Sequence, residues 1–100
     1  MIDLKKNFLN EVKQILNANV PHCKVLAFGS RVNDSAKKFS DLDIALIGHD
    51  KIKWHEIENL KDIFAESNLP IMVDIVDFNS VSKSFKMIIN KKHEVIKTNK

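Results

Sequence analysis

The chain has 100 residues, of which 44% are hydrophobic and 29% charged, as in an ordinary globular protein. This length predicts one small domain over residues 1–100. No apolar run approaches the ~20 residues of a membrane span, and the acidic Asp3, with no apolar segment after it, argues against a signal peptide. The single cysteine, Cys23, cannot form an internal disulfide, which favours a cytoplasmic location.

The net charge of +3 comes almost entirely from lysines spread along the chain. Scattered charge of this kind is typical of a solvated surface, so we expect neither a membrane nor a nucleic acid as a direct ligand. Arg31 is the one arginine, and it follows Gly29-Ser30. A guanidinium suits bidentate contacts to phosphate, so Arg31 is either a phosphate or partner contact or a surface charge.

The spacing of apolar residues predicts a succession of helices and strands. Asp3 is the expected N-cap of the first helix. Trp54 in the second long helix is either an interface anchor or, as we expect, a core residue. The predicted elements, in chain order, are a helix (3–17), a strand (24–28), a short helix or turn (30–36), a strand (41–47), a helix (51–67), a strand (71–78), a helix (81–91) and a short extended tail (93–97).

The strand over residues 41–47 is apolar on both faces once its acidic start is passed. A strand of this kind is buried between two layers. The sequence therefore predicts an α/β (α+β) fold, with a small mixed β-sheet of three or more strands flanked by helices.

Two carboxylates open that strand, directly after a Gly-Ser pair ends the previous one. Asp41 and Asp43 are two residues apart, so their side chains project to the same side, roughly 7 Å apart. Such a pair repels unless a cation lies between its members, and Mg²⁺ is the usual cation when phosphates complete its coordination. Gly29 and Ser30 suit a close approach by an anion. The alternative is a pair of capping residues at the strand entrance.

The strand over residues 71–78 carries two further acids. Asp74 and Asp77 are three residues apart and so face opposite sides, and at most one can join the first pair. Asp74 lies between apolar neighbours and is expected to be buried, where a carboxylate needs a cation or hydrogen bonds. This favours Asp74 as the third functional carboxylate, with Asp77 as a cap or a solvent-facing residue.

Taken together, these motifs resemble a known signature. Gly29-Ser30-Arg31 after a strand, then Ser40-Asp41-Leu42-Asp43, then a central Asp74 in a later strand, resembles the DNA polymerase beta-like nucleotidyltransferase superfamily. The small size resembles the minimal nucleotidyltransferase (MNT) branch of that superfamily. The resemblance extends from about residue 25 to residue 78 and implies the polymerase beta-like fold.

The resemblance also implies a role for each site residue. Gly29-Ser30 would hold the triphosphate of ATP, with Arg31 near its phosphates. Asp41 and Asp43 would bind two Mg²⁺ ions, and Asp74 would ligate the second ion or activate the acceptor hydroxyl. The implied reaction is an in-line displacement at the α-phosphorus, with pyrophosphate as the leaving group.

Small MNT proteins commonly pair with a helical HEPN protein. The resemblance therefore implies an antitoxin that transfers AMP from ATP to a tyrosine of a HEPN RNase toxin. A chain of 100 residues leaves no domain for the acceptor, so the acceptor is expected on another chain, and a homo- or hetero-oligomer is expected.

The segment Val32-Asn33-Asp34 departs from the signature, because many relatives place a small residue, a second arginine and a glycine there. Asn33 can adopt left-handed backbone geometry and is expected to replace that glycine one position early. The departure keeps alternatives open. The chain could be a catalytically weak antitoxin that acts by binding, a nucleotide sensor, or a transferase that modifies RNA or a small molecule.

Overall fold

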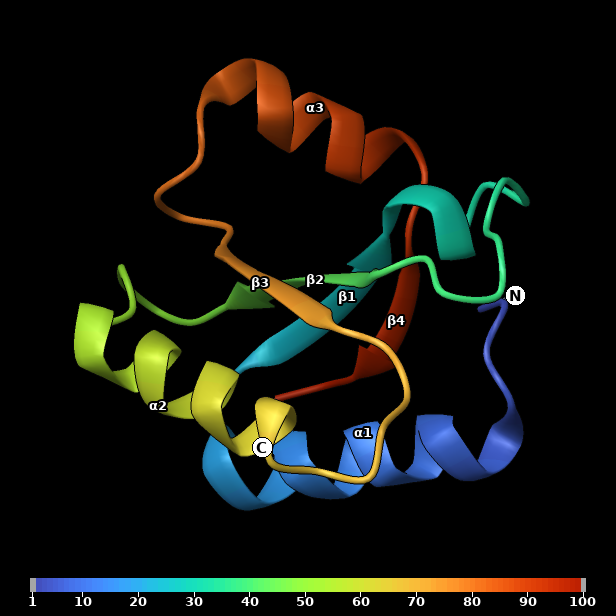
Figure 1. The fold of residues 1–100 in the computed structure, drawn as a ribbon. Helices are drawn as coiled ribbons and strands as arrows, with labels where there is room; N and C mark the ends of the chain where they lie inside the picture. The colour runs from blue at the N-terminus through green and yellow to red at the C-terminus, as the bar shows by residue number, and fades with distance from the viewer. Residues whose placement is uncertain (1, 100) are drawn as a thin grey trace.

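The computed structural model describes residues 2–99 as a four-stranded sheet with helices on both faces (Figure 1). The strand order is β3-β2-β1-β4. Within residues 2–99, no helix is both long and apolar enough to cross a membrane. The elements are α1 (Lys6–Asn19), β1 (Lys24–Phe28), the 3₁₀ helix η1 (Gly29–Arg31), β2 (Leu42–Ile47), α2 (Trp54–Ala65), β3 (Val73–Asp77), α3 (Lys83–Lys91) and β4 (Glu94–Lys97).

The sheet is mixed, as the sequence predicts. β1 pairs antiparallel with both β2 and β4, whereas β2 and β3 are parallel. A parallel pair needs a crossover connection, and α2 provides it. The predicted tail at 93–97 is an extended segment that joins the sheet as β4, at the edge opposite β3.

Alternating residues of the strands supply two apolar layers, one on each face of the sheet. Figure 1 shows α1 and α2 on one face and α3 on the other. In β2, Leu42 and Ile44 pack in the larger layer with α1 and α2, whereas Ala45 packs in the smaller layer with Ile89 of α3. The prediction that this strand is buried on both faces is confirmed.

Two local predictions are wrong. Asp3 does not cap α1, because the N-cap is Lys5 and Asp3 instead pairs through its main chain with Arg31. Trp54 is 77% exposed, because it begins α2 and lies outside the contact that Leu60 and Phe64 make with the core.

Candidate active site

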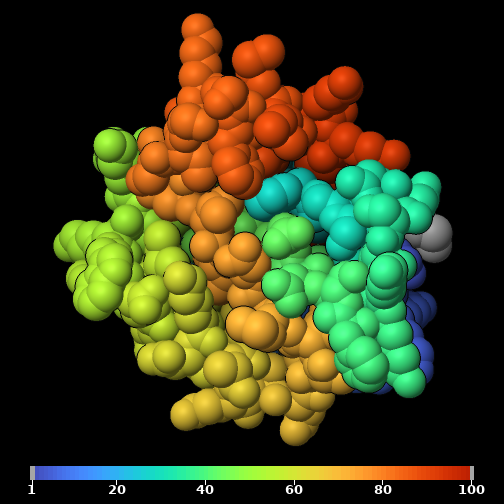
Figure 2. Space-filling model, turned by 45° about the horizontal axis from the view of Figure 1, so that its top comes forward, coloured from blue at the N-terminus to red at the C-terminus, as the bar shows by residue number. Residues whose placement is uncertain are grey.

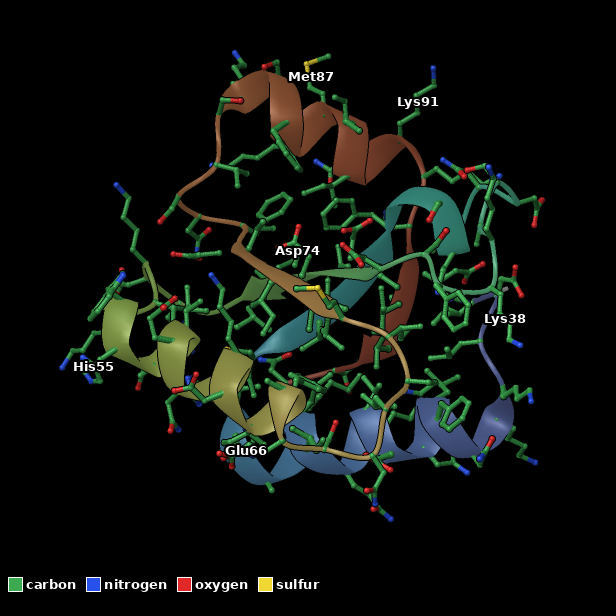
Figure 3. All side chains as sticks on the ribbon, in the orientation of Figure 1. Lys38, His55, Glu66, Asp74, Met87 and Lys91 are labelled. Atoms are coloured by element: carbon green, nitrogen blue, oxygen red, sulfur yellow. The ribbon has the colours of Figure 1, made fainter. Side chains whose placement is uncertain are left out.

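Three carboxylates gather on one face of the sheet, and we call Asp41, Asp43 and Asp74 the carboxylate cluster. Asp43 in β2 and Asp74 in β3 are direct partners in the register, and adjacent strands lie about 4.8 Å apart. The residues on either side of each one pack toward α1 and α2, so both face the other side, and Asp41, two residues before Asp43, does too. Figure 3 shows Asp74 rising from β3 on the side of the sheet where α3 lies.

Asp43 experiences the strongest electrostatic effect in the cluster. Partial burial is the main cause that raises the pKa of Asp43 to about 6, and the charges of Asp74 and then Asp41 raise it further. Negative charges thus lie together, and among residues 2–99 no cationic side chain contributes to the pKa of Asp43. Such a set of oxygen donors suits a hard cation such as Mg²⁺.

The carboxylate cluster can supply only part of the coordination of a metal ion. Within residues 2–99, no three His, Cys, Asp or Glu side chains form a group that could hold a metal ion by themselves. Mg²⁺ is usually held by one or two carboxylates together with water and substrate phosphates. The cluster supplies the carboxylate share of that coordination, and a nucleotide would have to supply the rest.

The backbone of Gly29 lies directly against the cluster. Gly29 has φ +79°, and a Cβ placed there would overlap Oδ2 of Asp43 and lie 3.3 Å from its Cγ. Only glycine allows both the conformation and this approach. The end of β1 is therefore held beside the carboxylate of Asp43 in β2, with Ser30 half-buried next to it.

We call residues 29–34 the Gly-Ser loop. The main-chain N–H groups of Val32 and Asn33 both donate to the carbonyl of Gly29, each at 3.0 Å. Asp34, not Asn33, takes the left-handed conformation, with φ 65°. The expectation for Asn33 is therefore wrong. The short polar side chain of Asp34 tolerates this geometry.

Arg31 is buried and bonded to main-chain carbonyls, so it is not the surface charge that the sequence left open as its alternative role. Its Nε and Nη2 donate to the carbonyl of Ser40 at 3.1 and 2.9 Å, and Nη1 donates to that of Asp3 at 2.6 Å. Nη2 also donates to the carbonyls of Lys37 and Lys38. The guanidinium thus connects the Gly-Ser loop to the segment just before Asp41. These hydrogen bonds hold the backbone that leads into the carboxylate cluster.

We expect Arg31→Lys to destabilise the fold, because an ammonium cannot reproduce the planar set of donors. The free energy of unfolding should fall by about 2 kcal/mol or more, as several charged hydrogen bonds are lost. Urea denaturation measures this change. Lys37→Ala is the matched control, since Lys37 meets Arg31 only through its carbonyl, and equal unfolding midpoints for the two variants would contradict the assignment.

The structure contradicts the predicted burial of Asp74 and confirms the prediction that Asp77 is a cap. Asp74 is exposed, because β3 is an edge strand of the described sheet. Asp77 is 5% exposed and accepts hydrogen bonds from the N–H groups of Ile52 and Asn79 and from the hydroxyl of Ser80, at 2.9, 3.1 and 2.7 Å. Asp77 is therefore a structural cap, while the side on which Asp74 lies agrees with the alternation argument.

A hollow of about 480 Å³ borders the Gly-Ser loop, and we call it the donor hollow. Its lining residues are Phe28, Gly29, Asn33, Ile88, Lys91 and Lys92. Figure 2 shows this face, where the chain around residue 30 (cyan), the segment before β2 (green) and β3 (orange) meet below α3. The two lysines bring positive charge to the loop from the end of α3, and no local sequence signal connects residues so far apart in the chain.

The raised pKa of Asp43 predicts a dependence of stability on pH. Between about pH 4 and pH 6 the folded protein retains a proton that the unfolded chain has released, so the metal-free protein loses stability as the pH rises through this window. Asp43→Asn removes this loss and should raise the unfolding free energy by about 1–2 kcal/mol above the window. Thermal melts of the wild type and of Asp43→Asn from pH 4 to pH 7 test this, and equal melts at every pH would contradict the prediction.

A small mixed sheet with a Gly-Ser loop held against clustered carboxylates is the architecture of an enzyme class that transfers nucleotidyl groups. The chain belongs to the polymerase beta nucleotidyltransferase family, whose profile matches residues 10–100. The predicted fold and the prediction of a nucleotidyltransferase are thereby confirmed.

One relative and two solved structures are similar to this chain over most of its length. The chain is 44% identical over 95 residues to the probable protein adenylyltransferase MntA of Haemophilus influenzae. The aligned residues cover 95% of this chain and 83% of the relative. A toxin–antitoxin crystal structure with AMP-PNP matches with a TM-score of 0.78 and 25% identity, over 92% of this chain and 74% of its own. A complex of the tri-AMPylated HEPN toxin and MNT antitoxin of Shewanella oneidensis matches in fold, with a TM-score of 0.74 and 23% identity, over 96% and 74% of the two chains.

Proposed function

We propose that this chain transfers AMP from ATP to a hydroxyl group of a partner protein, in a reaction that depends on Mg²⁺. The observation that carries the proposal is the carboxylate cluster held against the backbone of Gly29. The 44% identity to a probable protein adenylyltransferase supports AMP as the transferred group and a protein as its acceptor.

The proposed chemistry is a single displacement. The acceptor oxygen bonds to the α-phosphorus of ATP, the bond from that phosphorus to pyrophosphate breaks, and pyrophosphate leaves with the electron pair. Two bound Mg²⁺ ions would neutralise the charge of the phosphates and the leaving group. Asp41 and Asp43 would hold the ions, and Asp74 would ligate the second ion or accept the proton of the hydroxyl.

The donor hollow is the proposed place of the nucleotide. Gly29 and Ser30 would meet the triphosphate there, as the motif suggests. Lys91 and Lys92 line the same hollow as Asn33, and their flexible ammonium groups would compensate for the arginine that relatives carry at that position.

The proposed acceptor is a tyrosine of a HEPN RNase toxin, for which this chain serves as the antitoxin in the cytoplasm. Two structural relatives are toxin–antitoxin complexes, one with an ATP analogue and one with an AMPylated HEPN toxin. The carboxylate cluster reaches the edge of the sheet through the exposed Asp74 of β3, which supports an acceptor from another chain and a hetero-oligomer.

One observation favours a second function, a binding antitoxin with weak catalysis. Asp34 places a negative charge in the Gly-Ser loop, where a triphosphate would approach, and Arg31 is committed to carbonyl oxygens. A chain of this kind would neutralise its partner by covering it. Transfer to an RNA end or to a small hydroxylated molecule is a further alternative that keeps the chemistry and changes the acceptor.

Mass spectrometry tests the proposal. The product of the adjacent gene is co-expressed with this chain, and we expect it to gain the mass of one or more AMP units, with fragmentation placing them on tyrosine. A partner that forms a stable complex but gains no mass would favour the binding antitoxin. Transfer to RNA in the same lysate, without protein modification, would replace the acceptor.

A further inference from the structure

Two adjoining hollows follow the outer side of β3, and we call them together the edge groove. The larger, about 740 Å³, begins at Asp41 and Asp74 of the carboxylate cluster. The smaller, about 410 Å³, continues to Trp54 at the start of α2. Both include Glu58 and Lys61 of α2, so the groove is continuous along the edge strand. Figure 2 shows α2 (yellow-green) beside β3 (orange).

The geometry of the proposed reaction indicates the side of the sheet from which the acceptor approaches. In an in-line displacement the attacking oxygen and the leaving oxygen lie on opposite sides of the phosphorus. Across the sheet, Gly29 follows β1, Asp43 lies in β2 and Asp74 in β3. If pyrophosphate leaves toward Gly29, the acceptor must approach from beyond Asp74, and the edge groove opens there.

The edge of β3 offers main-chain groups to an extended peptide. Met72 and Phe78 bond to β2 through their main chains, at 2.9 Å each, and in a parallel ladder alternate residues do so. Val73 and Ile75 therefore direct their N–H and C=O groups to the outer side, where the described sheet has no further strand. An extended segment that pairs with such an edge gains main-chain hydrogen bonds.

The side chains along the groove define the chemistry of its occupant. Trp54 and Met72 are 77% and 74% exposed, and such residues are enriched in protein interfaces. The larger hollow is lined by four acids and one lysine, and that lysine, Lys61, is paired with Glu58 at 3.2 Å. The groove thus fits a segment with apolar side chains and a basic residue.

We infer that the acceptor protein binds through an extended, partly basic segment that pairs with the outer edge of β3. This segment fills the edge groove and places its hydroxyl-bearing residue beside Asp74. The inference rests on the proposed function and adds the surface that selects the acceptor.

Steady-state kinetics of AMP transfer to the co-expressed partner test the groove. The double variant Trp54→Ala, Met72→Ala should raise the KM for the partner about tenfold or more, as the loss of interface anchors does. Val95→Ala is the matched control, because Val95 is an exposed apolar residue of β4, at the opposite edge of the sheet. The dissociation constant for ATP is measured for each variant, and an equal loss of ATP binding would count against the groove.

Hydrogen exchange gives an independent measurement. The amides of Val73 and Ile75 should become protected when the partner binds, and unchanged exchange in a stable complex would overturn the pairing with β3. The two proposals fail differently. Transfer that is as efficient with the double variant as with Val95→Ala overturns the groove alone, whereas a wild type that modifies only RNA overturns the proposed function and the occupant with it.

Discussion

Replacing Asp41 and Asp43 by asparagine should abolish AMP transfer. Charge neutralisation by bound metal is worth several kcal/mol in such a displacement, and each 1.36 kcal/mol is a factor of ten in rate, so we expect a loss of about a thousandfold or more. The double variant keeps the shape of both side chains and removes the charges that would hold Mg²⁺. Pyrophosphate release and the mass of the partner are the measurements.

The loss should come from chemistry and not from unfolding. Asparagine at position 43 avoids both the burial of a charge and the repulsion that together raise the pKa of that carboxyl, so the variant should remain folded and should still bind its partner. Asp50→Asn is the control, since Asp50 is exposed and lies in the turn after β2. If the double variant neutralised a toxic partner at equal abundance, catalysis would be unnecessary and the chain would be a binding antitoxin.

The elements of this fold could be predicted because each leaves a periodic signal. Leu42, Ile44 and Ala45 show by alternation that β2 is buried on both faces, and the structure agrees. The position of Trp54 could not be predicted this way, because it continues the apolar stripe of α2 beyond the part that meets the sheet. Periodicity shows which face of a helix is apolar but not how far the neighbouring layer extends.

Features of the site that depend on local backbone geometry could be predicted from the sequence. Features that depend on contacts between distant parts of the chain could not. The side on which Asp74 lies follows from the alternation of a strand, but its exposure follows from the edge position of β3, which depends on strand order. The burial of Arg31 depends on carbonyls at Asp3 and Ser40, to which no sequence pattern points. Likewise, the lysines of α3 reach the Gly-Ser loop only because α3 covers that face of the sheet.

Gly29 should be the least replaceable residue of the Gly-Ser loop. Its φ of +79° lies in the left-handed region, which costs a residue with a Cβ about 1–2 kcal/mol. In Gly29→Ala the new methyl group would also overlap the carboxylate of Asp43 and push it away from the cluster. We therefore expect a loss of at least about 2 kcal/mol in unfolding free energy, together with loss of transfer.

The other glycine of the chain supplies the matched control for this prediction. A Cβ at Gly48 would come no closer than 3.4 Å to its nearest neighbour, the carbonyl oxygen of Asp50, and Gly48 has no left-handed φ. Gly48→Ala should therefore change stability by less than about 1 kcal/mol and leave transfer intact. Urea unfolding and transfer assays of both variants decide the matter. If Gly29→Ala behaved like Gly48→Ala, the close contact between Gly29 and Asp43 would be unnecessary for stability and for transfer, and the prediction would be wrong.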